Sequence, residues 1–180
     1  MKAPGVAVLI ILLAGCSSPA DDERKDLEAE AAVLLSWGID PTLVSAVATQ
    51  NAQNLTLTEI QRRDTEWVAG RDTARVRQMT TGACADRVRQ LMAQKSIYSE
   101  TFVMDNQGAL VCASEKTSDY WQGDEDKFIK SYKSGTGGTF IGPSELDASS
   151  GEHLAQISLP IRSGGTVIGA ITIGILVDDL

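Results

Sequence analysis

The sequence predicts an α+β fold in which a helical half comes first and an antiparallel sheet with one short helix follows. Residues 22–94 carry apolar side chains at helical spacing. Beyond residue 100 the composition changes, because 11 of the 16 glycines lie there. Two β-branched runs near the C-terminus flank a glycine turn, which is typical of a hairpin. Helices beside consecutive antiparallel strands form an α+β layer.

Composition and charge exclude several classes of function. The 180 residues are 43% apolar and carry a net charge of −8, which argues against nonspecific binding of nucleic acid. The single histidine, His153, excludes a site with several histidine ligands, and its polar surroundings predict a surface position. The sequence contains no GxSxG, GxxxxGK, HExxH or CxxC pattern. We therefore expect no enzymatic activity, no cofactor and no metal site.

The N-terminal sequence predicts an export signal and a lipid anchor. Lys2 precedes an apolar run over residues 3–13, too short for a spanning helix but typical of a signal peptide. The following Leu13-Ala14-Gly15-Cys16 resembles the bacterial lipobox. That resemblance implies a signal over 1–15, lipidation of Cys16, and a tether over 16–21 facing the periplasm. Ser17 favours the outer membrane in a Gram-negative cell. Several acyl chains would hold the protein at the membrane.

Residues 22–94 are expected to form several helices, of which 22–56 make a stem. Leu27 and Leu34 belong to the first apolar stripe, and Pro41 starts the next helix. Thr56 and Glu59 match a capping box, in which each side chain bonds the backbone of the other.

Two cysteines remain in the body of the chain, Cys84 and Cys112. An extracytoplasmic compartment permits a disulfide between them. Cys84 falls in a helical segment and Cys112 in a strand, and we expect two buried, unpaired thiols. The disulfide remains the alternative.

The second half predicts two hairpins and a helix between them. The first pairs 101–104 with 109–113 across a turn that Asp105 initiates. Residues 119–132 are expected to form the short helix, and 139–141 a strand. The second hairpin pairs 154–161 with 166–176, turning at 163–165.

Three segments of this half resemble the extracytoplasmic Cache sensor domains, also called PDC sensors. The run Phe102-Val103-Met104-Asp105-Asn106-Gln107-Gly108-Ala109-Leu110-Val111 is similar to their first hairpin. Residues 158–161 followed by 164–171 are similar to their last hairpin, and 117–125 resembles a subset of periplasmic single-Cache lipoproteins. The resemblance implies a PAS-like sheet after the helical stem, with a single Cache domain over 57–180. It also implies a ligand pocket near residue 120.

The resemblance assigns a set of pocket candidates. Tyr120, Trp121 and Asp124 come first, and Lys127 is expected to pair with Asp124 or to face a carboxylate ligand. Phe140 and Gln156 come second, from strands that cross the pocket floor. The alternative is that Tyr120 and Trp121 only plug the edge of the core. The adjacent Asp124, Glu125 and Asp126 are interpreted as a solvated helix N-terminus and not as a calcium site.

Two functions follow from these observations. The first is a lipid-anchored sensory module that binds a small polar metabolite and signals through a partner protein, since no output segment follows Leu180. The second is a structural or assembly lipoprotein that uses its sheet as an interaction surface.

Overall fold

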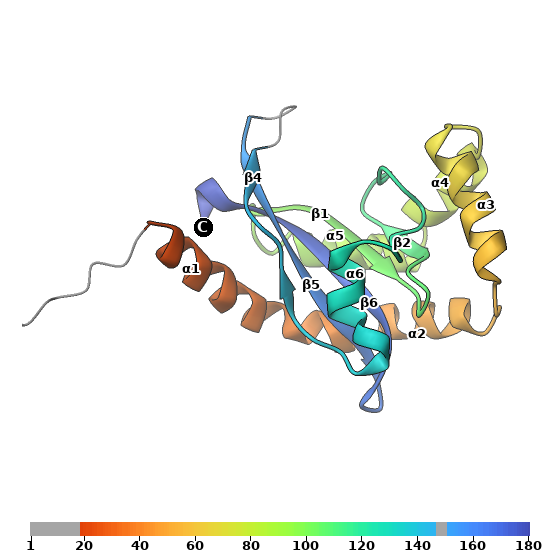
Figure 1. The fold of residues 1–180 in the computed structure, drawn as a ribbon, viewed down its shortest axis with the longest axis horizontal. Coiled ribbons are helices and arrows are strands. Elements are labelled where there is room, and N and C mark those ends of the chain that lie inside the picture. The colour runs from red at the N-terminus through yellow and green to blue at the C-terminus, as the bar shows by residue number, and fades with distance from the viewer. Residues whose placement is uncertain (1–18, 147–150) are drawn as a thin grey trace, which may run out of the picture.

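The structure is a computed structural model that describes residues 19–146 and 151–180. Its centre is an antiparallel sheet of six strands in the order β2-β1-β6-β5-β3, with β4 pairing with β5 beside β3 (Figure 1). Helices precede the sheet in the chain, and one short helix lies between its strands. The α+β class predicted from the sequence is confirmed. Cys16 and the signal segment lie outside the described residues.

The elements have the following bounds. The strands are β1 (Tyr98–Met104), β2 (Leu110–Ala113), β3 (Phe140–Ile141), β4 (Glu145–Leu146), β5 (His153–Ser163) and β6 (Thr166–Leu176). The α-helices are α1 (Pro19–Leu34), α2 (Pro41–Asn51), α3 (Leu57–Val68), α4 (Thr73–Thr80), α5 (Ala83–Met92) and α6 (Asp126–Tyr132). Short 3-10 segments are η1 (Leu35–Ile39), η2 (Lys133–Gly135) and η3 (Val177–Asp179).

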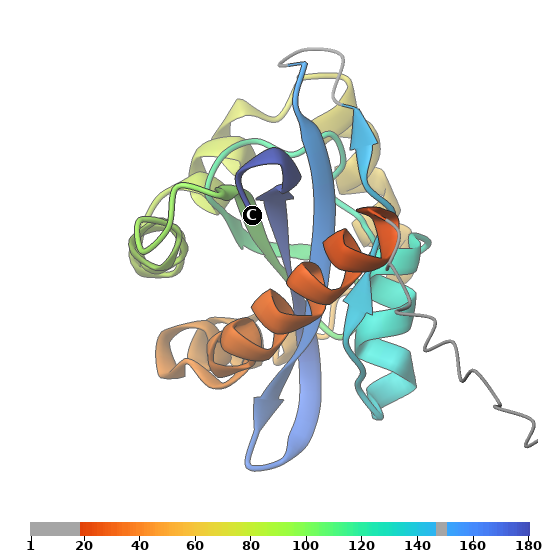
Figure 2. The same cartoon turned by 90° about the vertical axis from the view of Figure 1, so that its left-hand side faces the viewer.

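The sheet has two covered faces, and alternate strand residues point to each. The N-terminal helices cross one face (Figure 2), where α1, α2 and α5 bury their apolar stripes against the strands. This core includes Leu34, Trp37, Leu43, Val47, Val88, Val103, Leu159, Ile171 and Ile173. The helices of the expected 22–56 stem therefore share a core with the sheet.

The opposite face carries α6 and the segment that follows β2, with α3 and α4 at one end (Figure 1). Its buried side chains are Ile60, Trp67, Met79, Phe102, Met104, Ala109, Leu110, Ala113, Tyr120, Phe128 and Ala170. Two buried hydroxyls of this face, Ser158 and Thr172, hydrogen-bond each other at 2.8 Å between β5 and β6. This pairing satisfies polar groups that would otherwise be costly to bury.

Buried carboxylates fix the N-terminal helices to the rest of the molecule. Asp40 caps α2 by accepting from Thr42 N at 3.0 Å, and Arg87 on α5 donates to its second oxygen at 2.8 Å. Glu30 on α1 accepts from the Tyr98 hydroxyl and from Lys95 Nζ, the latter at 2.6 Å. Each acid is thus paired, as burial of a charge requires.

Both predicted hairpins are present. The β5–β6 turn places Gly164 at φ 54° and Gly165 at φ 88°, as a two-residue hairpin turn of type I′ requires. In the β1–β2 turn, Asp105 accepts from Gln107 N at 2.8 Å and from Ala109 N at 3.0 Å. Asp105 also accepts from Gln50 on α2 at 3.0 Å, and burial raises its pKa. Asp105 therefore has the structural role expected of it.

Two expectations from the sequence are corrected. The helix expected over 119–132 is confined to Asp126–Tyr132. Residues 119–125 are an irregular loop held to the rest of the fold by backbone bonds, including Leu110 N to Tyr120 O at 3.0 Å and Gln122 N to Gly108 O at 2.8 Å. Backbone groups bonded to the turn region are not free to form a helix.

The expected pair of free thiols is also wrong. Cys84 and Cys112 form a disulfide, with their Cα atoms 5.9 Å apart. Cys84 lies in the first turn of α5, which packs on β1 and β2, and Cys112 lies in β2. The two sulfurs meet because a helix crosses a strand, a relation that 28 residues of sequence separation do not reveal.

Within residues 19–146 and 151–180, no single helix is long and apolar enough to cross a membrane. The bent pair Ala20–Ile39 and Pro41–Asn51, which meet at 61°, reaches that length and composition together. Buried core helices share this property, and α1 and α2 contribute to the core.

Candidate binding cavity

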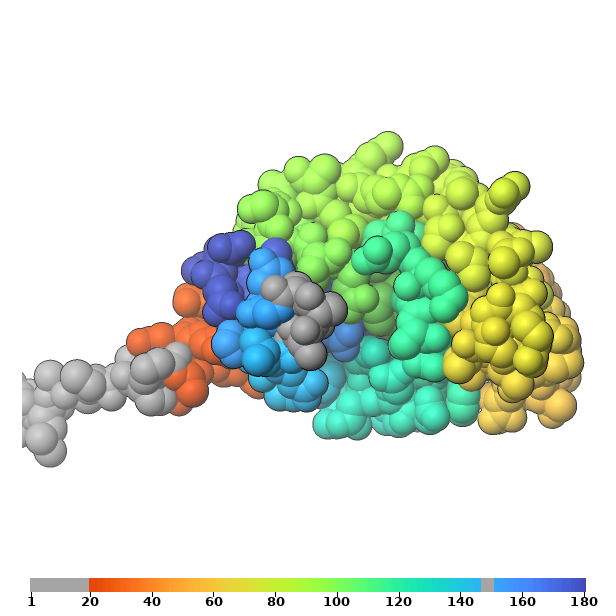
Figure 3. Space-filling model, turned by 90° about the horizontal axis from the view of Figure 1, so that it is seen from above, coloured from red at the N-terminus to blue at the C-terminus, as the bar shows by residue number. Residues whose placement is uncertain are grey.

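A cavity of about 560 Å³ opens on the α6 face of the sheet. Its walls are the start of α6 on one side and the β3–β4 segment on the other, and its floor is formed by β1, β5 and β6. On the surface, the light-blue β4 region and the teal region containing α6 lie beside each other (Figure 3). The volume is within the range of small-molecule sites. The lining residues are Glu100, Glu125, Asp126, Lys127, Phe140, Gly142, Pro143, Glu145, Leu146, Leu154, Gln156 and Gly174.

The floor depends on a glycine in the central strand. Gly174 pairs with Gln156 on β5, and Glu100 extends over it from β1. A Cβ at Gly174 would lie 2.7 Å from Glu100 Cγ and 2.5 Å from Ser99 Oγ. Because that space is open, Gln156 Nε2 can donate to Glu100 Oε1 at 2.9 Å across the strand between them. These two side chains form a polar floor.

Lys127 is the cationic residue of the α6 wall. Its Nζ lies 2.8 Å from Glu125 Oε2 and 5.3 Å from the centre of the Phe102 ring, and the side chain is only 14% exposed. The expected pairing with Asp124 is replaced by pairing with Glu125. The charge is thus satisfied by a carboxylate and an aromatic face.

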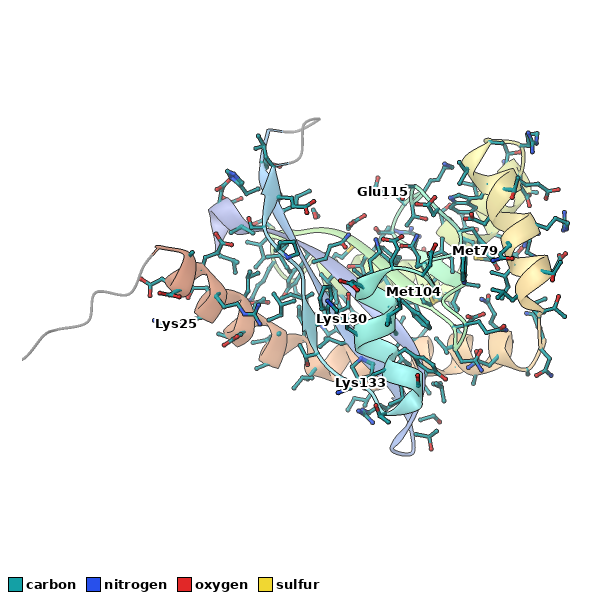
Figure 4. All side chains as sticks on the ribbon, in the orientation of Figure 1. Lys25, Met79, Met104, Glu115, Lys130 and Lys133 are labelled. Carbon is teal, nitrogen blue, oxygen red and sulfur yellow. A yellow bond between two sulfur atoms is a disulfide. The ribbon has the colours of Figure 1, made fainter. Side chains whose placement is uncertain are left out.

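Phe140 and the residues after it form the opposite wall. Lys130 on α6 places its Nζ 4.9 Å from the centre of the Phe140 ring, so the helix and β3 touch across one end of the cavity. Figure 4 shows Lys130 on α6. Gly142 N donates to Gln156 O at 2.8 Å, which holds the strand edge against β5.

The structure brings together three of the six ligand-binding candidates. Lys127, Phe140 and Gln156 line the cavity, from α6, β3 and β5. Tyr120, Trp121 and Asp124 do not line it. They belong to the loop before α6, which lies against α3 and the β1–β2 turn.

Tyr120 belongs to the core instead of the cavity. Its side chain is 0% exposed, and its ring centre lies 5.9 Å from that of Trp67. Arg75 lies over the ring at 5.6 Å. Burial raises the pKa of Tyr120. Its position agrees with the alternative in which the ring fills the core.

Trp121 fastens the loop to the first hairpin. Its indole Nε1 donates to Gln107 O at 2.8 Å, and its backbone N donates to Asp64 on α3 at 3.0 Å. Asp64 accepts from Tyr120 N as well, at 2.8 Å. One carboxylate therefore anchors two successive backbone groups of a loop that lacks regular structure.

Sequence reasoning missed the acidic part of the cavity. Glu100 and Glu145 come from β1 and β4, and β4 was not expected. Gly174 could have indicated the cavity floor from the sequence alone, since a glycine inside a β-branched strand often marks the close approach of another group. Nothing in the sequence pairs Glu100 with Gln156, which lie 56 residues apart.

Other polar candidates lie outside the cavity. His153 is half exposed and contacts Asp178 at 3.3 Å, a surface pair as expected for this histidine. Within the described ranges, no group of three His, Cys, Asp or Glu side chains is arranged to hold a metal ion.

No protein-family model matches the chain, and no curated protein matches it. Among solved structures, it is similar to the sensor domain of the V. cholerae histidine kinase DctB, with 15% identity and a TM-score of 0.41 over 84% of this chain and 49% of that one. The ligand-binding domain of the Campylobacter jejuni chemoreceptor Tlp3, in complex with 4-methylisoleucine, shares 15% identity at a TM-score of 0.43, covering 87% of this chain and 61% of that one.

A third similar structure is the ligand-binding domain of the Pseudomonas aeruginosa PAO1 amino acid chemoreceptor PctC in complex with GABA, at 14% identity and a TM-score of 0.43. That match covers 64% of this chain and 56% of the receptor domain. The chain thus spans between about half and three fifths of the length of these structures.

Proposed function

We propose that this protein is a lipid-anchored extracytoplasmic module that binds a small molecule in the cavity between α6 and the sheet and reports its bound state to a partner protein. The observation that carries the proposal is the cavity itself, about 560 Å³ with a polar floor and an aromatic wall. Sites of this kind combine apolar surface with a few placed polar groups. The resemblance of the two hairpins to Cache sensors supports the same function.

The lining favours binding over catalysis. The described residues around the cavity are carboxylates, one lysine, one amide and apolar side chains, without serine, cysteine or histidine. Lys127 is already paired with Glu125, so it is not available as a free amine nucleophile. Gln156 can donate and accept hydrogen bonds but does not transfer protons. We therefore infer a binding module and not an enzyme.

The cell envelope is the compartment that best fits the chain. The lipobox-like Leu13-Ala14-Gly15-Cys16 supports export and lipidation at Cys16. The Cys84–Cys112 disulfide supports an oxidising compartment, where such bonds persist. We further propose that the bound state is passed on through a partner protein.

A thermal-shift screen of the full chain in detergent tests the proposal. A compound that binds only the folded state raises the melting temperature, and the rise grows with the logarithm of its concentration relative to Kd. We expect at least one polar metabolite, from a set of anions, cations and neutral compounds, to raise it. The variant Gln156→Leu should lose the shift, and the matched variant Gln61→Leu on the exposed surface of α3 should keep it.

Absence of a shift for every compound would contradict small-molecule binding and favour the assembly lipoprotein. A shift that survives in Gln156→Leu would move the binding site away from this cavity.

A further inference from the structure

The cavity carries more negative charge than its surroundings neutralise. Four of its lining side chains are acidic, Glu100, Glu125, Asp126 and Glu145, and one is basic. Lys127 pairs with Glu125 at 2.8 Å, and Lys130 pairs with Asp126 at 2.7 Å. Glu100 and Glu145 have no cationic partner among the described residues. Two uncompensated carboxylates therefore face one space.

Glu100 is the central one of these two. It is half buried on the floor, and the only hydrogen-bond partner of its carboxylate in the described chain is the neutral amide of Gln156, which donates to Oε1. Oε2 is left open. A carboxylate that is partly withdrawn from water without a counter-charge is destabilising, and a cation placed beside it offsets that cost.

The fold keeps the Glu100 carboxylate on the cavity floor without a cationic partner in the described part of the chain. Gly174 leaves the space through which Glu100 reaches Gln156, so the carboxylate is kept over the floor. Lys127, the cation in the lining, is held by Glu125 and by the face of Phe102. Its charge is therefore already balanced by a carboxylate of the lining, and no ion pair joins it to Glu100 among the described residues.

We propose that the ligand of this cavity is a small organic cation, a compound that carries an ammonium group and no carboxylate. This inference rests on the proposed function and names the charge of its ligand. The ammonium donates to Glu100 Oε2 on the floor, and Glu145 at the rim adds attraction on entry. Leu154, Pro143 and Phe140 supply the surface for an alkyl or aromatic body.

Three four-carbon probes separate the charge classes at matched size: butane-1,4-diamine, butane-1,4-diol and succinate. We expect titration calorimetry of the full chain at low salt to show the diamine binding at least tenfold more tightly than the other two. Its affinity should fall as salt is added, because screening weakens attraction between charges near the surface.

The variant Glu100→Gln tests the role of the floor. Glutamine preserves the shape and can still accept from Gln156, so the fold should be retained while the affinity for the diamine falls at least tenfold. The matched control is Glu115→Gln, an exposed acid on the segment after β2 (Figure 4), which should bind the diamine as the wild type does.

Each other outcome overturns the inference. Equal binding of the three probes, or no binding of the diamine, contradicts a cationic ligand. Unchanged diamine affinity in Glu100→Gln removes Glu100 from the site. If succinate or another anion binds and depends on Gln156, the cation inference fails while the proposed sensory function stands. If no compound of any charge binds, the proposed function fails as well.

Discussion

The ring of Tyr120 contributes to the core of the α6 face, where it contacts Trp67 and is closed off from solvent. We predict that Tyr120→Ala lowers the free energy of unfolding by about 3–5 kcal/mol, as truncation of a buried aromatic ring does. Tyr120→Phe should cost only about 1 kcal/mol, since it removes only the hydroxyl and keeps the buried ring. Urea denaturation measures both. A Tyr120→Ala variant that keeps wild-type stability but loses ligand binding would restore the pocket role.

Glu59 shows how a surface acid gives stability a pH dependence. Its carboxylate bonds Arg62 and Arg63 instead of returning to the Thr56 backbone, so half of the expected capping box is present. The hydrogen bond from Arg62, then that from Arg63, lowers the pKa of Glu59 from 4.5 to about 2.

A lowered pKa in the folded state means that this contribution to stability is present above pH 4.5 and is lost as the pH falls towards 2. We predict that the wild type loses more stability between pH 5 and pH 2 than Glu59→Gln does, by urea denaturation. The difference should shrink in high salt, because the cluster is exposed. Parallel pH profiles for the two proteins would contradict this assignment.

At the scale of elements, the disulfide joins α5 to the edge strand β2. Closing a loop of 28 residues restricts the unfolded chain, by about 3–4 kcal/mol in the chain-entropy account. We predict that Cys84→Ala/Cys112→Ala loses this amount in urea denaturation. The wild type in reductant should approach the double variant. A wild type that is insensitive to reductant would show that the thiols are free.

The elements also show which features a sequence can predict. The β5–β6 hairpin follows from local chemistry, since β-branched runs flank Gly164 and Gly165. The β1–β2 turn follows from Asp105 in the same way. The loop before α6 does not, because its conformation depends on Asp64 and on backbone bonds to the first hairpin. The Cys84–Cys112 bond and the Glu100–Gln156 contact likewise depend on which elements are neighbours in space.

Some residues of the candidate site were predicted correctly from the sequence and others were not. Lys127, Phe140 and Gln156 line the cavity, and the resemblance to Cache domains selected the last two as residues of strands that cross the pocket floor, whereas Phe140 lies in a wall. Tyr120 and Trp121 were selected for their large rings, which serve core packing and loop attachment equally well. Ring size alone does not separate these uses, because each removes apolar surface from water.

For the whole molecule, we predict that Cys16→Ser releases the protein from the membrane into the soluble extracytoplasmic fraction, since the lipid is the proposed anchor. The net charge of −8 would repel the domain from an anionic leaflet, so charge would not hold it there. Cell fractionation with immunoblotting measures this, and the size of the product shows whether the signal was cleaved. A cleaved variant that stays on the membrane would contradict lipid anchoring.

The central claim is that a small molecule binds between α6 and the sheet, and two-dimensional NMR of the labelled protein tests it most directly. With a compound that raises the melting temperature, we predict that the largest shifts occur at the Gln156 side-chain amide and at the backbone amides of Gly142 and Gly174, which surround the cavity floor. The Trp121 indole, bonded to Gln107 outside the cavity, should shift little. Shifts centred on Trp121, with Gln156 and Gly174 unchanged, would contradict the account.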